Sequence, residues 1–295
     1  MKIITVATEI HGYYNILLES AEKYQYELIT LGMGEEWDGY TMKYKLMNDY
    51  LNSLPDDDST NNEIIIFLDG YDTFILNEHE LLLERYETFG KPLVFGSQWN
   101  RKTGDWWSRY IISTFSSGFK DVMNSGSYMG PVWALKKKFH MLCSQFDCNL
   151  TSQNDQKLLN KSRMLEPEFH ERYVAIDKSG IIFHNAAYYS SMYYAPWFKN
   201  CILFNDIEID KKDNKLLIRD TSIEPIFISG PGNVDLESYA EYKGLGEKVI
   251  KRPDNEYGFE FYKEYALELT IYYGGIGLAI SIILLLLKKL YTTYF

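Results

Sequence analysis

Residues 63–72 read EIIIFLDGYD, and this stretch decides the fold. The continuous apolar run at 64–68 is typical of a central parallel strand that is covered on both faces. The run ends in Asp69-Gly70-Tyr71-Asp72, so two carboxylates lie three positions apart where the strand leaves the core. Ligands in open α/β sheets bind outside the carboxyl ends of the strands. The stretch therefore predicts an α/β domain with a polar site at the end of this strand.

Short β-branched runs alternate with amphipathic segments on both sides of this strand. The patterns predict further strands over residues 3–7, 26–31, 92–96 and 225–229, a hairpin over 201–219, and helices over 11–24, 40–54, 77–89, 134–145, 153–159 and 235–244. This alternation of strand and helix indicates a doubly wound α/β sheet.

The C-terminal residues have a different composition. Residues 269–287 carry no charge, and at about 1.5 Å per residue they span roughly 28 Å, enough to cross a bilayer core. The alternative is a buried core helix. We expect a domain over 1–244, a linker over 245–268, a transmembrane helix over 269–287 and a short tail over 288–295. The protein would be a tail-anchored, single-pass membrane protein with its domain in the cytosol, although the charges of Lys288-Lys289 favour the opposite orientation.

Composition and charge argue against some classes of function. Of the 295 residues 46% are apolar, which predicts a folded core. The net charge of -11 argues against a nucleic-acid partner, because phosphate backbones require a basic surface. A small phosphate-bearing substrate is compatible with this charge when a bound cation neutralises the phosphate.

Three polar segments are candidates for chemistry. Asp69 and Asp72 can hold one hard divalent cation, which would bridge the diphosphate of a nucleotide sugar; the alternative is an ordinary acidic turn. The segment Asn124-Ser125-Gly126 either lets the backbone approach a ligand closely or forms a bulged strand. Asp155, at the start of a predicted helix, either caps that helix or faces a substrate.

Taken together, these segments resemble the glycosyltransferase domain of the multifunctional procollagen lysyl hydroxylases. The resemblance covers residues 2–244 and rests on motifs in order, at 5–9, 20–22, 30–37, 67–72, 124–130 and 155–156. It implies a GT-A type fold in a stand-alone form, such as a viral or microbial one. It also implies transfer of glucose or galactose from UDP-glucose or UDP-galactose to a hydroxyl acceptor, such as hydroxylysine in a collagen-like protein.

The resemblance further implies roles for individual residues. Asp69 and Asp72 would hold Mn2+, and Asn154 and Asp155 would be catalytic beside the donor sugar and the acceptor. The residues that would bind the donor are Thr8, Trp37 and Tyr71 around the uridine, Lys43 facing the diphosphate, and Asn124, Ser125, Gly126 and Gly230.

Two positions depart from the pattern of that family. The family has a histidine that completes the metal site, and this chain has Ser229 there. A hydroxyl is a poorer ligand than an imidazole. The acidic triplet of the family is reduced to Gln153-Asn154-Asp155. Both departures favour the alternative function, a membrane-anchored domain that binds a nucleotide sugar or a partner protein with weak or no catalysis.

Overall fold

The computed structural model describes most of the chain. The described residues are 1–98, 121–146, 154–186, 207–219, 221–230 and 235–250, with scattered helical positions between 270 and 286. Every contact given below is between described residues.

A six-stranded sheet with the order β2-β1-β3-β6-β5-β7 forms the centre of the molecule. Its strands are β1 (Lys2–Val6), β2 (Glu27–Leu31), β3 (Ile64–Asp69), β5 (Leu93–Ser97), β6 (Met123–Pro131) and β7 (Val174–Asp177). β1 pairs in parallel with β2 and β3, and β5 with β7, whereas β6 runs antiparallel to β3 and β5. The start of β6 therefore lies at the same edge of the sheet as the ends of β1 and β3.

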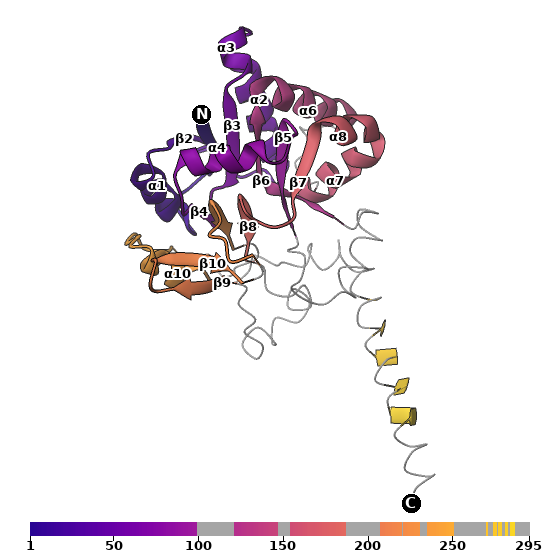
Figure 1. The fold of residues 1–295 in the computed structure, drawn as a ribbon. Helices are drawn as coiled ribbons and strands as arrows, with labels where there is room; N and C mark the ends of the chain where they lie inside the picture. Colours follow the sequence, from indigo (N-terminus) through magenta and orange to yellow (C-terminus); the bar gives the residue numbers. More distant parts are fainter. Residues whose placement is uncertain are drawn as a thin grey trace, which may run out of the picture.

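Helices cover both faces of this sheet (Figure 1). They are α1 (Tyr14–Lys23), α2 (Met42–Ser53), α3 (Asp58–Asn61), α4 (His79–Glu87), α6 (Val132–Gln145), α7 (Asp155–Leu165), α8 (Pro167–Tyr173) and α10 (Glu237–Tyr242). Ile65 and Phe67 of β3 join the core cluster that includes residues of α2 and α6. Ile66 and Leu68 join the cluster on the other face, with residues of α1 and α4. The prediction of a central strand covered on both faces, in an α/β domain, is confirmed.

A smaller sheet lies beside the main one. It has the order β4-β11-β8 and consists of β4 (Thr73–Ile75), β8 (Phe183–Asn185) and β11 (Phe227–Ser229). The predicted hairpin is present within the described residues as β9 (Ile207–Asp210) and β10 (Lys215–Ile218). Sequence patterns predicted β11, within the expected strand over 225–229, but neither β4 nor β8.

The first residues of the predicted linker pack onto the domain. Leu245 is 2% exposed. Ile250 and Gly12 exchange two backbone hydrogen bonds, at 2.7 and 3.3 Å. The contacts of the domain therefore extend beyond residue 244, as far as Ile250.

The predicted C-terminal transmembrane helix is wrong. Part of the predicted span, 269–287, lies outside the described residues. A charge-free composition makes a segment apolar, but a helix that crosses a bilayer must also be about 20 residues long. In the part of the chain that the structure describes, no helix combines the length and the apolar character that a bilayer crossing requires. The expectation of a single-pass, tail-anchored membrane protein is therefore wrong as well.

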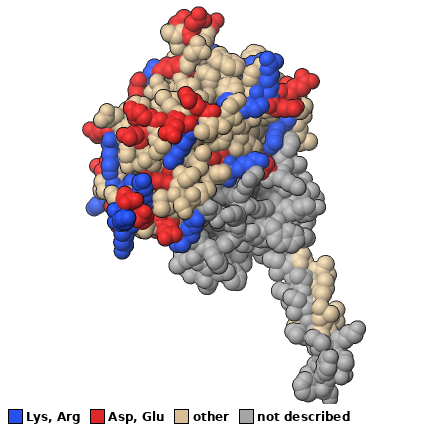
Figure 2. All heavy atoms as spheres, viewed as in Figure 1, with Lys and Arg blue, Asp and Glu red and all other residues tan. Residues whose placement is uncertain are grey.

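Charged side chains of both signs are interspersed on the face shown in Figure 2. Acidic side chains gather around α3, where the sequence has Asp56-Asp57-Asp58, and lysines gather at the hairpin turn with Lys211-Lys212. On this face the two signs are therefore mixed, apart from an acidic group at α3 and a basic group at the hairpin turn.

Candidate functional site

A buried lysine joins two carboxylates at the edge where β3 ends. Lys43, in the first turn of α2, places its Nζ 3.0 and 3.3 Å from the two carboxylate oxygens of Asp69. The same Nζ lies 2.7 Å from Oδ2 of Asp155, the first residue of α7. The side chains of Lys43, Asp69 and Asp155 are 10%, 30% and 7% exposed. We call these three residues the Lys43 cluster.

Lys43 keeps its own positive charge between the two carboxylates of the cluster. Burial disfavours the charge on Lys43, but the carboxylates of Asp155 and Asp69 outweigh burial and raise the pKa of the lysine. Lys43 is therefore protonated at neutral pH, at the position where the sequence predicted contact with a diphosphate.

Gly126 of β6 lies directly against Asp69. A Cβ atom at position 126 would lie 2.3 Å from Oδ2 of Asp69, so any other residue would displace the carboxylate. The Gly126 N–H donates to Oδ1 of Asn124 at 2.6 Å. The N–H and hydroxyl of Ser125 donate to Oε1 of Gln156, at 2.8 and 3.1 Å. The predicted segment 124–126 thus belongs to a strand and also borders the carboxylate.

The start of α7 is fixed by its own side chains. Oδ1 of Asn154 accepts the N–H of Lys157 at 2.9 Å and so caps the helix. Oδ1 of Asp155 accepts the N–H of Gln156 at 2.8 Å, and the Tyr44 hydroxyl donates to the backbone carbonyl of Asp155 at 2.8 Å. For Asn154 the observed contact is a capping one, whereas Asp155 also reaches into the Lys43 cluster.

The small sheet brings residue 229 to the second aspartate of the motif. Ser229 of β11 pairs with Thr73 of β4, the residue after Asp72. The Thr73 Oγ1 lies 2.8 Å from the Ser229 Oγ and 3.0 Å from Oδ1 of Asp72. The Gly230 N–H donates to the Asp72 carbonyl at 2.7 Å. Asp72, Ser229 and Gly230, predicted to share a site, therefore lie together.

Tyr71 and Thr8 meet beside the same strand ends. The Tyr71 hydroxyl accepts the N–H groups of Thr8 and Glu9, at 2.8 and 3.3 Å. The ring of Tyr71 stacks on His11 with a centroid distance of 3.5 Å. The sequence does not predict a role for His11 in the site, because no local pattern indicates an aromatic stack between residues 60 positions apart.

The loop that holds Trp37 begins at this point. The Gly34 N–H donates to the Thr8 carbonyl at 2.9 Å. Trp37 is 41% exposed and contacts the ring of Tyr40 edge-on, at a centroid distance of 6.2 Å. The loop therefore starts next to the pair formed by Thr8 and Tyr71 and presents an indole ring to solvent.

The metal-binding capacity of these residues is limited. Among the residues that the structure describes, no three His, Cys, Asp or Glu side chains are grouped so that they could hold a metal ion. The predicted donors are Asp69 and Asp72, with Ser229 next to Asp72. Two carboxylates suit a hard cation when oxygens of a bound phosphate supply further ligands. The donor set therefore fits a cation that is shared with a substrate.

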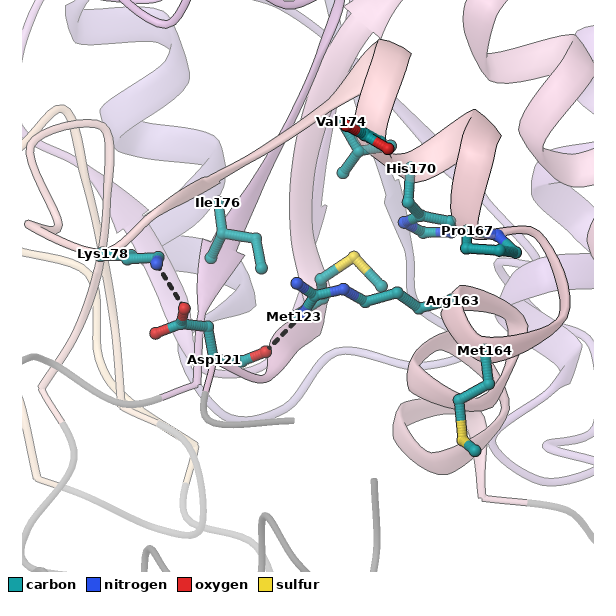
Figure 3. A pocket seen from close by; sticks show the side chains of 10 residues that line it. Asp121, Met123, Arg163, Met164, Pro167, His170, Val174, Ile176 and Lys178 are labelled. Carbon is teal, nitrogen blue, oxygen red and sulfur yellow. Dashed lines mark hydrogen bonds and ion pairs between the residues drawn. The ribbon is translucent and has the colours of Figure 1, made fainter. Parts of the chain in front are cut away.

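A separate cavity of about 480 Å³ lies near the other end of α7 (Figure 3). It is lined by Asp121, Met123, Arg163, Met164, Pro167, His170, Glu171, Val174, Ile176 and Lys178. Asp121 forms an ion pair with Lys178, and its carbonyl accepts a hydrogen bond from Arg163 at 2.9 Å. Arg163 is eight residues from Asp155, about 12 Å along the helix. The cavity uses none of the predicted site residues.

Comparisons with known proteins identify the family of this chain. The sequence profile of the family described as "PLOD GT domain" matches residues 1–242. A procollagen-lysine,2-oxoglutarate 5-dioxygenase of Drosophila melanogaster is 26% identical over 256 residues, which cover 82% of this chain and 32% of the fly protein. A multifunctional procollagen lysine hydroxylase and glycosyltransferase of Rattus norvegicus is 26% identical over 195 residues, 62% of this chain and 24% of the rat protein.

These relatives are much longer proteins, and this chain matches a third of their length or less. One solved structure, a glycosyltransferase involved in the glycosylation of the major capsid of PBCV-1, has 13% identity and a TM-score of 0.41, and covers 83% of this chain and 99% of its own. That likeness is too low to carry an argument. The profile match spans most of the chain, and the chain belongs to the family of PLOD glycosyltransferase domains.

Proposed function

We propose that this chain transfers glucose or galactose from UDP-glucose or UDP-galactose to a hydroxyl group of a protein. The proposed acceptor is hydroxylysine in a collagen-like polypeptide. The observation that carries the proposal is the Lys43 cluster, in which a buried ammonium lies 3.0 Å from Asp69 and 2.7 Å from Asp155 at the end of the central strand. Lys43 and a divalent cation held by Asp69 would together neutralise the diphosphate of a nucleotide sugar at this edge.

The uridine end of the donor is proposed to lie against Thr8, Tyr71 and Trp37. Two backbone N–H groups and a stacked histidine hold the Tyr71 side chain in one orientation. Trp37 offers an exposed face on which a base can stack. Lys43 would then meet the diphosphate next to this base pocket.

The divalent cation, proposed to be Mn2+, would be held by Asp69 and Asp72 together with phosphate oxygens. When bound, it would neutralise the diphosphate and stabilise the departing UDP. Gly230 donates its N–H to the carbonyl of Asp72 and so holds the turn that carries this carboxylate.

The sugar is proposed to lie between β6 and the start of α7. The segment Asn124-Ser125-Gly126 borders Asp69 there, and Gln156 holds Ser125 in place through two hydrogen bonds. Asp155 is kept as the candidate catalytic carboxylate beside the sugar. Asn154 supports it by capping the helix.

The second candidate is a domain that binds the nucleotide sugar with weak or no turnover. Two observations favour it. The side-chain oxygen of Asn154 accepts the capping hydrogen bond of α7. Ser229, where the resemblance implies a histidine, is hydrogen-bonded to Thr73.

Mass spectrometry separates the two candidates. The purified chain is incubated with Mn2+, each of the two donors, and a collagen-like peptide that contains hydroxylysine; the same peptide with lysine is the control. Transfer to the first peptide alone supports the transferase. Binding of UDP without transfer or hydrolysis favours the second candidate, and no binding of UDP contradicts both.

The base pocket has its own test. Replacing Trp37 with alanine should weaken UDP binding by about 1–3 kcal/mol, the range for a base stacked on an aromatic ring. Met33, 45% exposed in the same loop, supplies the control variant Met33→Ala, which should leave the affinity unchanged. Equal affinities of wild type and Trp37→Ala in calorimetry would remove Trp37 from the pocket.

A further inference from the structure

The two carboxylates of the Lys43 cluster hold the lysine unequally. Asp155 is the closer partner, at 2.7 Å, and its side chain is 7% exposed. Asp69 is farther away, with both oxygens at 3.0 and 3.3 Å, and its side chain is 30% exposed. Lys43 can therefore release Asp69 and keep its closer, more deeply buried partner.

Asp69 is also the carboxylate that a divalent cation would need. The other predicted carboxylate, Asp72, accepts a hydrogen bond from Thr73 at 3.0 Å. Ser229, next to it, shares a 2.8 Å hydrogen bond with the same threonine. Without a nucleotide, a cation would have to displace the ammonium of Lys43 from Asp69, and the described residues offer no group of three His, Cys, Asp or Glu side chains to hold it in return.

A bound nucleoside diphosphate changes this balance. Its phosphate oxygens supply further ligands to the cation. They also offer the ammonium new acceptors when it leaves Asp69, and Lys43 retains Asp155 throughout. The ammonium of Lys43 and the divalent cation then both have negatively charged partners.

We infer that Lys43 and the divalent cation compete for the Asp69 carboxylate, so that the cation binds measurably only together with the nucleoside diphosphate. Lys43 is thus the counter-ion of Asp69 before the ligands bind. It prevents the cation from binding until the nucleoside diphosphate is present. The inference rests on the proposed function, because it takes UDP as the diphosphate.

Calorimetry on the whole chain tests the order of binding without any variant. Mn2+ alone, titrated to millimolar concentration, should show no saturable binding. Mn2+ in the presence of saturating UDP should bind one ion per chain. If Mn2+ binds as tightly without UDP as with it, the competition does not exist. If UDP does not bind under any condition, the proposed function fails and the coupled binding fails with it.

Variants of Lys43 then test the competitor itself. Lys43→Gln should raise the affinity for Mn2+ alone by about tenfold or more, the effect that one neighbouring charge has on the proton affinity of a carboxylate. Lys43→Arg, which keeps the charge, should not raise it.

Because Lys43→Gln leaves the buried Asp155 unpaired, the double variant Lys43→Gln/Asp155→Asn is measured as well. It also frees Asp69 from competition and relieves the unpaired charge, so it should again bind Mn2+ alone more tightly than wild type. Circular dichroism confirms that each variant is folded. If the folded variants without the lysine bind Mn2+ no more tightly than wild type, the inference is overturned.

Discussion

Among the described residues, Lys43 and Lys138 are two buried lysines whose partners differ in kind. Lys43 lies between the carboxylates of Asp69 and Asp155. Lys138 of α6, 1% exposed, donates a 2.6 Å hydrogen bond to the hydroxyl of Ser162, and its Nζ lies 2.8 Å from Nε2 of His170. One ammonium has two negative partners, and the other has a hydroxyl and an imidazole.

Because their partners differ, the pKa values of the two buried lysines shift in opposite directions. Burial lowers the pKa of Lys138 to about 7, with only partial opposition from the charge of Glu166. Burial, Lys138 and Arg163 together lower the pKa of His170 to about 3. For Lys43, the two carboxylates more than offset burial and raise the pKa. Burial alone therefore does not decide the charge of a lysine, and only Lys43 is a dependable cation at neutral pH.

The largest expected effect comes from removing the charge of each lysine. Lys43→Met should lower the free energy of unfolding by about 3–5 kcal/mol, because Asp155 is left buried without its counter-ion. Lys138→Met leaves no charge unpaired, so it should cost far less or stabilise the domain. Urea denaturation at pH 7 compares the two variants. Equal losses would mean that the partners of the two lysines do not matter for stability.

The pH dependence of stability sharpens the comparison further. The unfolded chain binds a proton at Lys138 up to about pH 10.5, whereas the folded chain releases it near pH 7. The cost of burying Lys138 is therefore fully present below pH 7 and declines as the pH rises toward 10.5. Between pH 7 and 9 the free energy of unfolding should increase, by at most about 1.4 kcal/mol per pH unit.

Lys138→Met is the control for this slope. The variant lacks the titrating group, so its stability should change less than that of wild type over the same range. Denaturation at pH 7, 8 and 9 gives the two slopes before exposed tyrosines ionise. A wild-type slope that persists unchanged in Lys138→Met would assign the pH dependence to other groups.

The sequence predicted the scaffold of the site better than its contacts. The run at 64–68 was sufficient to predict a buried strand and a carboxylate at its end, because both follow from local composition. Lys43 contacts two carboxylates, one of them 112 positions away, because of the way α2 and α7 pack. No local sequence pattern predicts this packing. The motif at 155–156 likewise does not indicate that the side chain of Gln156 fixes Ser125.

The prediction of a C-terminal membrane span is wrong, because no helix within the described residues has both the length and the apolar character that a crossing requires. The charge-free stretch at 269–287 indicated the apolar character alone. Ser229 shows the opposite case. The resemblance alone marked it as a departure from an implied histidine, whereas its hydrogen bond to Thr73 follows from the pairing of β4 with β11.

The smallest expected effect concerns the helix that carries Asp155. Asn154→Ala should cost about 1 kcal/mol of stability through loss of the cap on α7. Asp57 caps the four-residue helix α3 in the same way, by accepting the N–H of Thr60 at 2.9 Å. Asp57→Ala is the matched control.

Only the cap on α7 adjoins the Lys43 cluster, so only Asn154→Ala should also weaken UDP binding. Thermal denaturation and calorimetry of both variants measure the two effects. Equal UDP affinities of Asn154→Ala and Asp57→Ala would show that the start of α7 does not need to be fixed for donor binding.

The pairing of β11 with β4 has a consequence for biosynthesis. All six strands of the main sheet lie before residue 178, so a ribosome-bound chain can complete that sheet early. Ser229 and Gly230, which complete the surroundings of Asp72, emerge later, after the hairpin of β9 and β10. During translation the domain would therefore pass through a stage in which its main sheet is assembled while one side of the site next to Asp72 is still missing.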